Sequence, residues 1–200
     1  DLIVLRHYDN DAAERAASVC EIPIINAGNG TGEHPTQALL DLYTIHKERG
    51  TIDGLTVTMM GDLKYGRTVH SLTKLLRMYD TRLRFVSPET LAMPGDYVRD
   101  SDECHGDLAP LVGETDVLYV TRVQTERCDE SPTIDVSYAV TLEDMARTKP
   151  DMVLMHPLPR VGEIPPELDA DPRAAYFRQM KYGLLVRMAL LLAMLEPRGL

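Results

Sequence analysis

The sequence predicts an α/β protein with two domains, each built on a parallel sheet flanked by helices. Short apolar runs of the kind that form buried strands alternate along the chain with longer amphipathic stretches of the kind that form helices. Strands that alternate with helices are joined by crossovers and therefore lie parallel, with helices on both faces of the sheet. The composition agrees, because 44 % hydrophobic and 26 % charged residues in a chain of 200 are typical of a globular protein with a core.

The first group of elements ends at Gly50, a residue type that commonly follows the last turn of a helix. The group consists of a strand, a helix, a strand and a helix, expected over residues 2–5, 11–20, 23–26 and 35–47. The second helix of the group begins at Pro35. Proline is favoured in a first helical turn because the amide hydrogen that it lacks has no partner there.

After Gly50 the alternation resumes. Strands are expected over residues 55–60, 83–87, 117–121 and 152–155, and helices over residues 68–79, 95–100, 141–148 and 174–195. A domain boundary falls between Gly50 and Gly54, where the first group of elements ends. We therefore expect domains over residues 1–49 and 50–169, and a segment over residues 170–200 whose helix packs back on the first domain.

Charge and composition exclude several classes of function. The net charge is −10 and the basic residues are scattered, so no nucleic-acid partner is expected. Three cysteines without the spacing of a zinc site or a disulfide framework indicate a reducing, cytoplasmic compartment. The most apolar stretch, residues 184–195, is too short for a membrane span and contains Arg187. The chain opens on a strand without an initiating Met, as the later part of a longer protein would.

Residues 61–67 predict an anion-binding turn. The strand over residues 55–60 ends at Gly61, and a helix is expected just after Arg67, with Lys64 and Gly66 between them. Glycines allow a sharp turn, and the free amide groups at a helix N-terminus attract anions. The expected ligand of Arg67 is therefore a carboxylate or a phosphate.

Polar side chains stand at three further edges of apolar segments. His34 and Gln37 lie three residues apart on the first turn of one helix and therefore share a face, although His34 in such a place often serves only as a helix cap. Arg6 ends its strand and points into the crevice where parallel sheets bind ligands, unless it is an ordinary surface residue. Arg122 and Gln124 follow the strand over residues 117–121, and an arginine fork matches a carboxylate in two parallel bonds.

Two other segments, residues 28–32 and residues 156–160, are interpreted as structural turns or loops. Residues 28–32 are rich in glycine and follow a strand, which raises a dinucleotide-binding loop as an alternative. The G-x-G-x-x-G pattern and the ribose-binding acid are missing, so a flexible loop that opens the helix at Pro35 is favoured. Residues 156–160 close the last strand with two prolines, which stiffen a turn and present its carbonyl groups as fixed acceptors.

Four motifs together resemble the catalytic chain of the aspartate carbamoyltransferases (aspartate transcarbamoylases), in order and in spacing, from residue 1 to about 195. They are His34-Pro35-Thr36-Gln37, Gly61-Asp62-Leu63-Lys64-Tyr65-Gly66-Arg67-Thr68-Val69-His70-Ser71, Thr121-Arg122-Val123-Gln124 with Glu126-Arg127, and His156-Pro157-Leu158-Pro159-Arg160. The ornithine-specific relatives carry cysteine in place of Thr36 and in place of Pro157. These two positions favour the aspartate branch.

The resemblance implies transfer of a carbamoyl group from carbamoyl phosphate to the amine of L-aspartate, in de novo pyrimidine biosynthesis. The groups that it implies for binding carbamoyl phosphate are Arg6, His34, Gln37, Leu158 and Pro159. Those that it implies for binding aspartate are Arg67, Arg122 and Gln124. Arg6 and His34 are the expected catalytic residues, because they would stabilise negative charge on the carbamoyl oxygen. Neither a metal nor a cofactor is implied.

The resemblance also implies a homotrimer with shared active sites, and either a regulatory subunit or fused pyrimidine-pathway domains. Family chains run to roughly 300 residues, the size of two α/β domains, and their first third holds a Ser-Thr-Arg-Thr phosphate loop and the Ser and Lys lent to a neighbouring subunit. We therefore expect an incomplete first domain and an isolated chain that is inactive. A non-catalytic scaffold of this fold and an ornithine-type transferase are the alternative functions. Tyr8 and Asn29 replace the family's usual Pro and Asp near Arg6.

Overall fold

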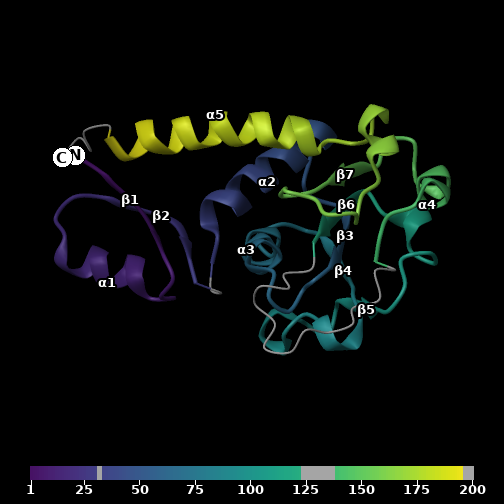
Figure 1. Ribbon diagram of the computed structural model, residues 1–200, viewed down its shortest axis with the longest axis horizontal. Coiled ribbons are helices and arrows are strands. Elements are labelled where there is room, and N and C mark those ends of the chain that lie inside the picture. Colours follow the sequence, from purple (N-terminus) through teal and green to yellow (C-terminus); the bar gives the residue numbers. More distant parts are fainter. Residues whose placement is uncertain (31–32, 123–137, 196–200) are drawn as a thin grey trace.

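Two separate parallel sheets form the framework of the molecule (Figure 1). The computed structural model describes residues 1–30, 33–122 and 138–195. In the smaller sheet β1 (Ile3–His7) pairs with β2 (Ile24–Asn29), and α1 (Ala12–Val19) connects the two strands. The larger sheet has the order β5-β4-β3-β6-β7, and every neighbouring pair in it is parallel. Its strands are β3 (Thr56–Gly61), β4 (Arg82–Val86), β5 (Glu103–His105), β6 (Val117–Thr121) and β7 (Val153–Met155).

Helices cover the larger sheet and join it to the smaller one. The α-helices after β2 are α2 (Pro35–Arg49), α3 (Arg67–Leu76), α4 (Leu142–Arg147) and α5 (Tyr176–Leu195). Short 3₁₀ turns occupy Glu89–Leu91, Gly95–Tyr97, Val112–Glu114 and Pro166–Ala170. In Figure 1, α5 runs along the top of the molecule from the larger sheet towards β1 and β2. Among the described helices, none has both the length and the apolar character needed to cross a bilayer.

The central strands are buried on both faces, which is why they read as continuous apolar runs. Along β6, Val117 and Tyr119 belong to one buried apolar cluster, whereas Leu118 and Val120 belong to the other. The first cluster includes residues of α2 and α3, and the second includes Met145 of α4. Parallel sheets are normally covered on both sides in this way. The predicted fold class, parallel sheets flanked by helices, is confirmed.

One local prediction was wrong, and one strand was missed. The helix expected over residues 95–100 is a single 3₁₀ turn, Gly95–Tyr97, because the backbone is extended on either side of it, with ψ 142° at Pro94 and 135° at Val98. The strand β5, Glu103–His105, was not predicted. It is a short strand without an apolar run. It lies at the edge of the sheet, where β4 is its only partner among the described strands.

Contacts between α2 and α5 join the first group of elements to the C-terminal helix. Glu48 of α2 accepts hydrogen bonds from Arg178 at 2.7 Å and from the hydroxyl of Tyr182 at 3.0 Å, both on α5. At the start of α5, the amide of Ala175 donates to the carbonyl of Leu154 in β7 at 2.8 Å. The last helix is therefore bonded both to the larger sheet and to α2. The proposed domain limits of 1–49, 50–169 and 170–200 stay a prediction.

Candidate functional site

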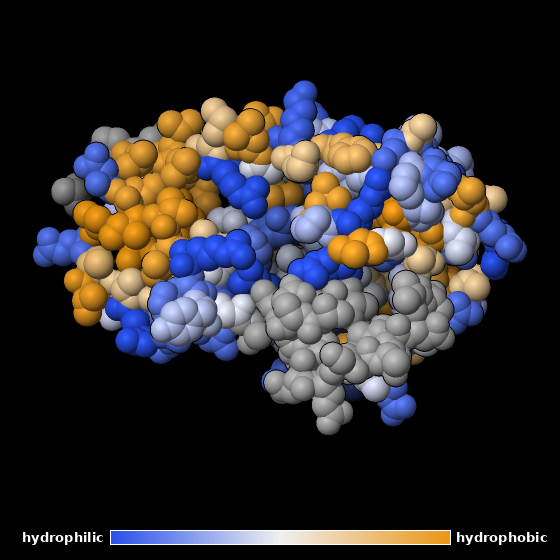
Figure 2. All heavy atoms as spheres, in the orientation of Figure 1, coloured by the Kyte–Doolittle hydropathy of each residue, from blue (hydrophilic) through white to orange (hydrophobic). Residues whose placement is uncertain are grey.

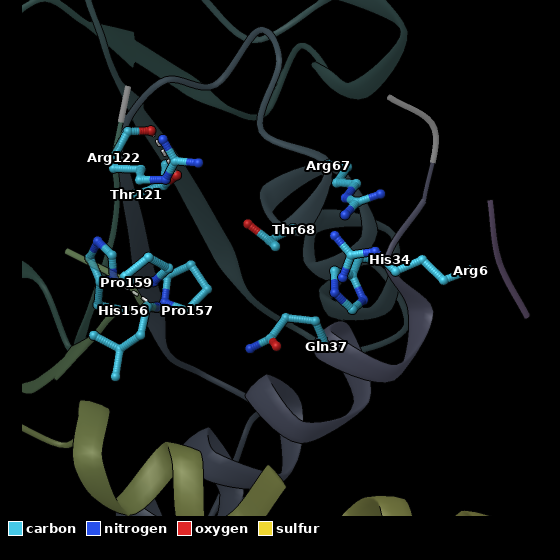
Figure 3. Close-up of a pocket in the computed structure, with 11 residues that line it drawn as sticks. Arg6, His34, Gln37, Arg67, Thr68, Thr121, Arg122, His156, Pro157 and Pro159 are labelled. Atoms are coloured by element: carbon cyan, nitrogen blue, oxygen red, sulfur yellow. Dashed lines mark hydrogen bonds between the residues drawn. The ribbon is translucent and has the colours of Figure 1, made fainter. Parts of the chain in front are cut away.

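A pocket of about 300 Å³ lies where the carboxyl ends of the strands meet the N-termini of α2 and α3 (Figure 3). Its lining comes from β1, α2, α3, β6 and the turn after β7: Arg6, His34, Gln37, Arg67, Thr68, Thr121, Arg122, His156, Pro157, Leu158 and Pro159. The pocket contains every predicted site residue except Gln124, which lies outside the described residues. The sequence positions of these residues are far apart, and the fold brings them together at one edge.

The entry into α2 builds one wall. His34 is the residue before the first turn and Pro35 is the first helical residue. Within the described residues, the His34 side chain makes no capping hydrogen bond, so the structure does not support the helix-cap alternative. The His34 backbone amide donates to Ser71 Oγ of α3 at 2.9 Å, which fixes the start of α2 on α3. Arg6 extends from β1 towards the pocket, although much of its side chain is exposed.

Arg67 is the first residue of α3, directly after Gly66. Its side chain is only 8 % exposed, and Nη1 donates to the carbonyl of Gly30 at 3.0 Å. The turn that places it needs glycine at position 61, where φ is 120° and a Cβ would lie 2.1 Å from the carbonyl oxygen of Thr121. The turn therefore has the predicted geometry, and its arginine joins the two units of the fold, whereas anion binding there stays a prediction.

The glycine-rich segment begins within β2 and packs against Arg67. A Cβ at Gly28 would lie 3.1 Å from Nη1 of Arg67, so the guanidinium fills the space beside this glycine. Asn29 is still part of β2, and its side-chain oxygen accepts from the amide of Glu33 at 2.9 Å. The described part of the segment thus packs against a side chain of this chain, which does not favour a dinucleotide loop.

The turn after β7 builds the opposite wall around His156, which is 1 % exposed. The amide of Leu158 donates to His156 Nδ1 at 2.8 Å, so Nε2 carries the hydrogen and donates to Glu163 at 2.6 Å. Burial raises the pKa of Glu163, but the bonds from His156 and from backbone amides outweigh it and leave the pKa below its usual value. Leu158 has φ 52° and is followed by a cis peptide bond to Pro159. The ring of His156 therefore fixes the turn from inside.

The electrostatics of the pocket are strongly cationic. Arg6, Arg67 and Arg122 all line it, and none of the described residues in its lining is Asp or Glu. The chain as a whole carries a net charge of −10, so the site is a local exception. A cleft lined by charge of one sign concentrates ligands of the opposite sign. The arrangement is suited to a small ligand with several negative charges. In the described part of the chain, no cluster of His, Cys, Asp and Glu could hold a metal ion.

Two polar residues of α5, Gln179 and Arg187, lie near Gln37 and were not predicted from the sequence. A hollow of about 360 Å³ adjoins the pocket and adds Gln179 and Arg187 of α5 to its lining. Nη2 of Arg187 lies 3.5 Å from Oε1 of Gln37. Arg187 stands in the most apolar stretch of the sequence, and a lone charge in such a helix was the signal that could have indicated a buried polar contact. Gln179 had no such signal.

The fold and the pocket define a class: an α/β protein with a pocket lined by arginines between two parallel-sheet units. Residues 53–194 match the Asp/Orn binding domain of the aspartate/ornithine carbamoyltransferases, and residues 1–47 match their carbamoyl-P binding domain. The chain therefore belongs to the aspartate/ornithine carbamoyltransferase family. The family resemblance predicted from the four motifs is confirmed.

Individual relatives agree. The chain is 50 % identical over 196 residues to the aspartate carbamoyltransferase catalytic subunit of Archaeoglobus fulgidus, covering 96 % of this chain and 66 % of that protein. It is 52 % identical over 202 residues to multifunctional protein URA2 of Saccharomyces cerevisiae, covering 96 % of this chain and 9 % of that protein. Aspartate transcarbamoylase from Trypanosoma cruzi in complex with carbamoyl phosphate has a TM-score of 0.89 at 45 % identity, over 96 % of this chain and 65 % of that one. The chain spans just under two thirds of the length of the two aspartate carbamoyltransferases.

Proposed function

We propose that the protein containing this chain transfers the carbamoyl group of carbamoyl phosphate to the amine of L-aspartate, which yields N-carbamoyl-L-aspartate and phosphate for pyrimidine biosynthesis. The observation that carries the proposal is the pocket in which Arg6, Arg67 and Arg122 converge with His34. The related Trypanosoma cruzi aspartate transcarbamoylase has been solved with carbamoyl phosphate and aspartate bound, which supports both substrates.

The chemistry that we propose needs binding and orientation rather than a protein nucleophile. The amine nitrogen of aspartate attacks the carbamoyl carbon, and negative charge develops on the carbamoyl oxygen, where Arg6 and His34 stabilise it. The bond from carbon to the phosphate oxygen then breaks, and the departing phosphate takes the amine proton. Arg67 and Arg122 hold the two carboxylates of aspartate, with Gln124 beside them, so the amine stays within reach of the carbon.

Gln37 and the turn at Leu158 and Pro159 complete the proposed carbamoyl-phosphate site. Gln37 lines the pocket from α2, and the turn faces it from the other wall. The stiff backbone of the turn offers carbonyl groups as fixed acceptors for the carbamoyl amide hydrogens. Two walls from different units of the fold thus hold the reacting group between them.

Aspartate suits this pocket better than ornithine does. When the side-chain amine of ornithine attacks the carbamoyl carbon, its α-ammonium would stand where aspartate places one of its two carboxylates, and Arg67 and Arg122 would repel that ammonium. Thr36 and Pro157 also differ from the cysteines of the ornithine-specific relatives. A direct comparison of kcat/KM for the two amino acids tests the choice. Faster turnover of ornithine would overturn it.

The experiment that tests the whole proposal is kinetics of the Arg122→Ala variant in the complete protein. Removing one partner of a buried charge pair typically costs about 2–5 kcal/mol, so kcat/KM for aspartate should fall by at least ~30-fold, since ~1.4 kcal/mol is tenfold. The matched control is Arg147→Ala, because Arg147 is exposed and donates only to the Ala109 carbonyl, at 2.8 Å, among its described contacts. Unchanged turnover of aspartate in Arg122→Ala would contradict the assignment.

We expect the chain by itself to bind ligands of the site without catalysing the reaction. Calorimetry of these 200 residues with carbamoyl phosphate, and then with a bisubstrate analogue that joins a phosphonate to aspartate, separates the two properties. Binding of the analogue without turnover would agree with our proposal that the remainder of the protein supplies further catalytic groups. Turnover by the chain alone would contradict it and would also exclude the non-catalytic scaffold as an alternative.

We further propose a cytoplasmic homotrimer with shared active sites, either with a regulatory subunit or fused to other pyrimidine-pathway domains. Several relatives support fusion, because they are multifunctional proteins such as protein CAD of Squalus acanthias. Figure 2 shows apolar side chains gathered at the left end of the molecule, where β1 and the C-terminal end of α5 lie in Figure 1. The exposed apolar residues of these two elements include Ile3, Val4, Leu192 and Leu195. Apolar surfaces of this kind mark protein contacts. A monomeric mass in light scattering of the complete protein would contradict the trimer.

A further inference from the structure

Asp41 is completely buried where α2, β6 and α5 meet. Its Oδ1 accepts hydrogen bonds from Nε2 of Gln37 at 2.8 Å and from Nε2 of Gln179 at 2.7 Å. Its Oδ2 accepts from the hydroxyl of Tyr119 at 2.8 Å. These donors come from α2, α5 and β6, so one carboxyl group joins three elements. A buried carboxylate is costly unless its oxygens are hydrogen-bonded, and here both oxygens have partners.

The partners of Asp41 reach both walls of the pocket. Gln37 lines the pocket on the α2 side. On the other side, Oε1 of Gln179 accepts from the backbone amide of His156 at 3.0 Å, and His156 in turn accepts from the amide of Leu158 at 2.8 Å. A continuous path of hydrogen bonds therefore runs from Gln37 through Asp41 and Gln179 to the turn at Leu158.

We propose, on the basis of the proposed function, that Asp41 is a positioning residue that sets the spacing between the two walls of the carbamoyl-phosphate site. It holds the side chain of Gln37 directly and holds the backbone at His156 through Gln179. It touches neither substrate. Its contribution is therefore geometric: it keeps the carbamoyl group aligned between Gln37 and Leu158.

The chemistry of the cluster explains why a carboxyl group suits this position. Gln37, Gln179 and Tyr119 all present donors, and the two oxygens of a carboxylate have enough acceptor sites for all three. Arg187 of α5 adds a favourable charge, and Thr68 of α3 is hydrogen-bonded to the far side of Tyr119. Alanine at position 41 would leave three buried donors without an acceptor. Asparagine retains one acceptor oxygen for the two glutamine amides, and the Tyr119 hydroxyl can turn to accept from the new amide.

The test uses steady-state kinetics and calorimetry on the complete protein with Asp41→Ala, Asp41→Asn and the control Thr44→Val. Thr44 is equally buried on the same helix, but its hydroxyl bonds only the Leu40 carbonyl, at 2.7 Å, among its described contacts. A misplacement of about 1 Å at a reacting centre costs about 100-fold in rate. We expect Asp41→Ala to lose about 100-fold in kcat/KM for carbamoyl phosphate, Asp41→Asn to recover most of it, and Thr44→Val to match the parent.

A second variant covers the case in which Asp41→Ala does not fold. Gln179→Met keeps the length of the side chain, removes both the bond that Gln179 donates to Asp41 and the bond that it accepts from the His156 amide, and leaves the bond from Gln37 to Asp41 in place. It should raise KM for carbamoyl phosphate about tenfold, whereas Thr44→Val leaves KM unchanged. If the folded Asp41 and Gln179 variants match Thr44→Val in kcat and KM, the positioning role is wrong. If the parent protein does not carbamoylate aspartate at all, the proposed function fails instead, and the two outcomes are distinguishable.

Discussion

Replacing Asp41 with asparagine should change the way in which the stability of the protein depends on pH. Burial is the main cause that raises the pKa of Asp41 from 3.8 to about 7, against the opposing hydrogen bonds from Tyr119, Gln179 and Gln37. One pH unit corresponds to about 1.4 kcal/mol. The difference between 3.8 and about 7 is therefore equivalent to about 4 kcal/mol of free energy of unfolding.

The sign follows from which state binds the proton more tightly. Asp41 is protonated more easily in the folded protein, so its contribution is fully present below pH 3.8 and is lost as the pH rises through about 7. Asp169 acts in the opposite direction, because Arg160 and Tyr176 lower its pKa to about 2. For this reason the prediction concerns the difference in free energy of unfolding between the parent and Asp41→Asn. The contributions of the other titratable groups cancel in this difference.

The assay is urea denaturation of both proteins at a series of pH values from 4 to 8, with the free energy of unfolding extrapolated to water. The parent should lose about 4 kcal/mol relative to Asp41→Asn across this range. Parallel curves for the two proteins would refute the reasoning, because they would show that Asp41 titrates alike in the folded and unfolded states. Thr44→Val, a neutral substitution on the same helix, is a suitable control, and its curve should run parallel to that of the parent.

Three further substitutions have separate expectations. Gly61→Ala should cost about 3 kcal/mol of stability in urea denaturation, because φ is 120° and the new Cβ would lie 2.1 Å from the carbonyl oxygen of Thr121. Thr141→Ala should cost about 1 kcal/mol in the same assay, since it removes the capping box of α4, and no loss would show that the box is not formed in solution. The hydrogen bond from Arg178 lowers the pKa of Glu48, so Arg178→Ala should raise this pKa in an NMR titration. The variant should be less stable than the parent at neutral pH, and the difference in stability should vanish as the pH falls through the pKa of Glu48.

Much of the fold was predictable because the central strands are buried on both faces. The strand over residues 117–121 has the same bounds in the structure, since all five of its residues are buried and the flanking residues are not apolar. The edge strand β5 was missed for the opposite reason: Cys104 stands between two polar residues, and none of the three residues is buried. Periodicity identifies an element only where burial selects the side chains.

Most of the candidate site was also predictable, and for a local reason. Arg122 directly follows β6 and Arg67 begins the helix that follows β3, so the topology of a parallel sheet brings both to one edge. The roles of the site residues stay predictions. Gln124 lies outside the described residues, so the structure does not place it. The function of the glycine-rich segment was not predictable, because its partner, the guanidinium of Arg67, comes from a different part of the chain.

The polar side of α2 shows where reasoning from a pattern reaches its limit. Gln37, Asp41 and Glu48 recur at helical spacing, and such a stripe is usually assigned to solvent. Here the stripe faces α5 instead: its three residues bond to Arg187, Gln179 and Arg178 in turn. The partners lie on a helix whose own sequence is mostly apolar, so neither helix reveals the pairing by itself. A polar stripe is a solvent face only if no other element covers it, and in this protein the covering helix is the one that fixes the two walls of the pocket relative to each other.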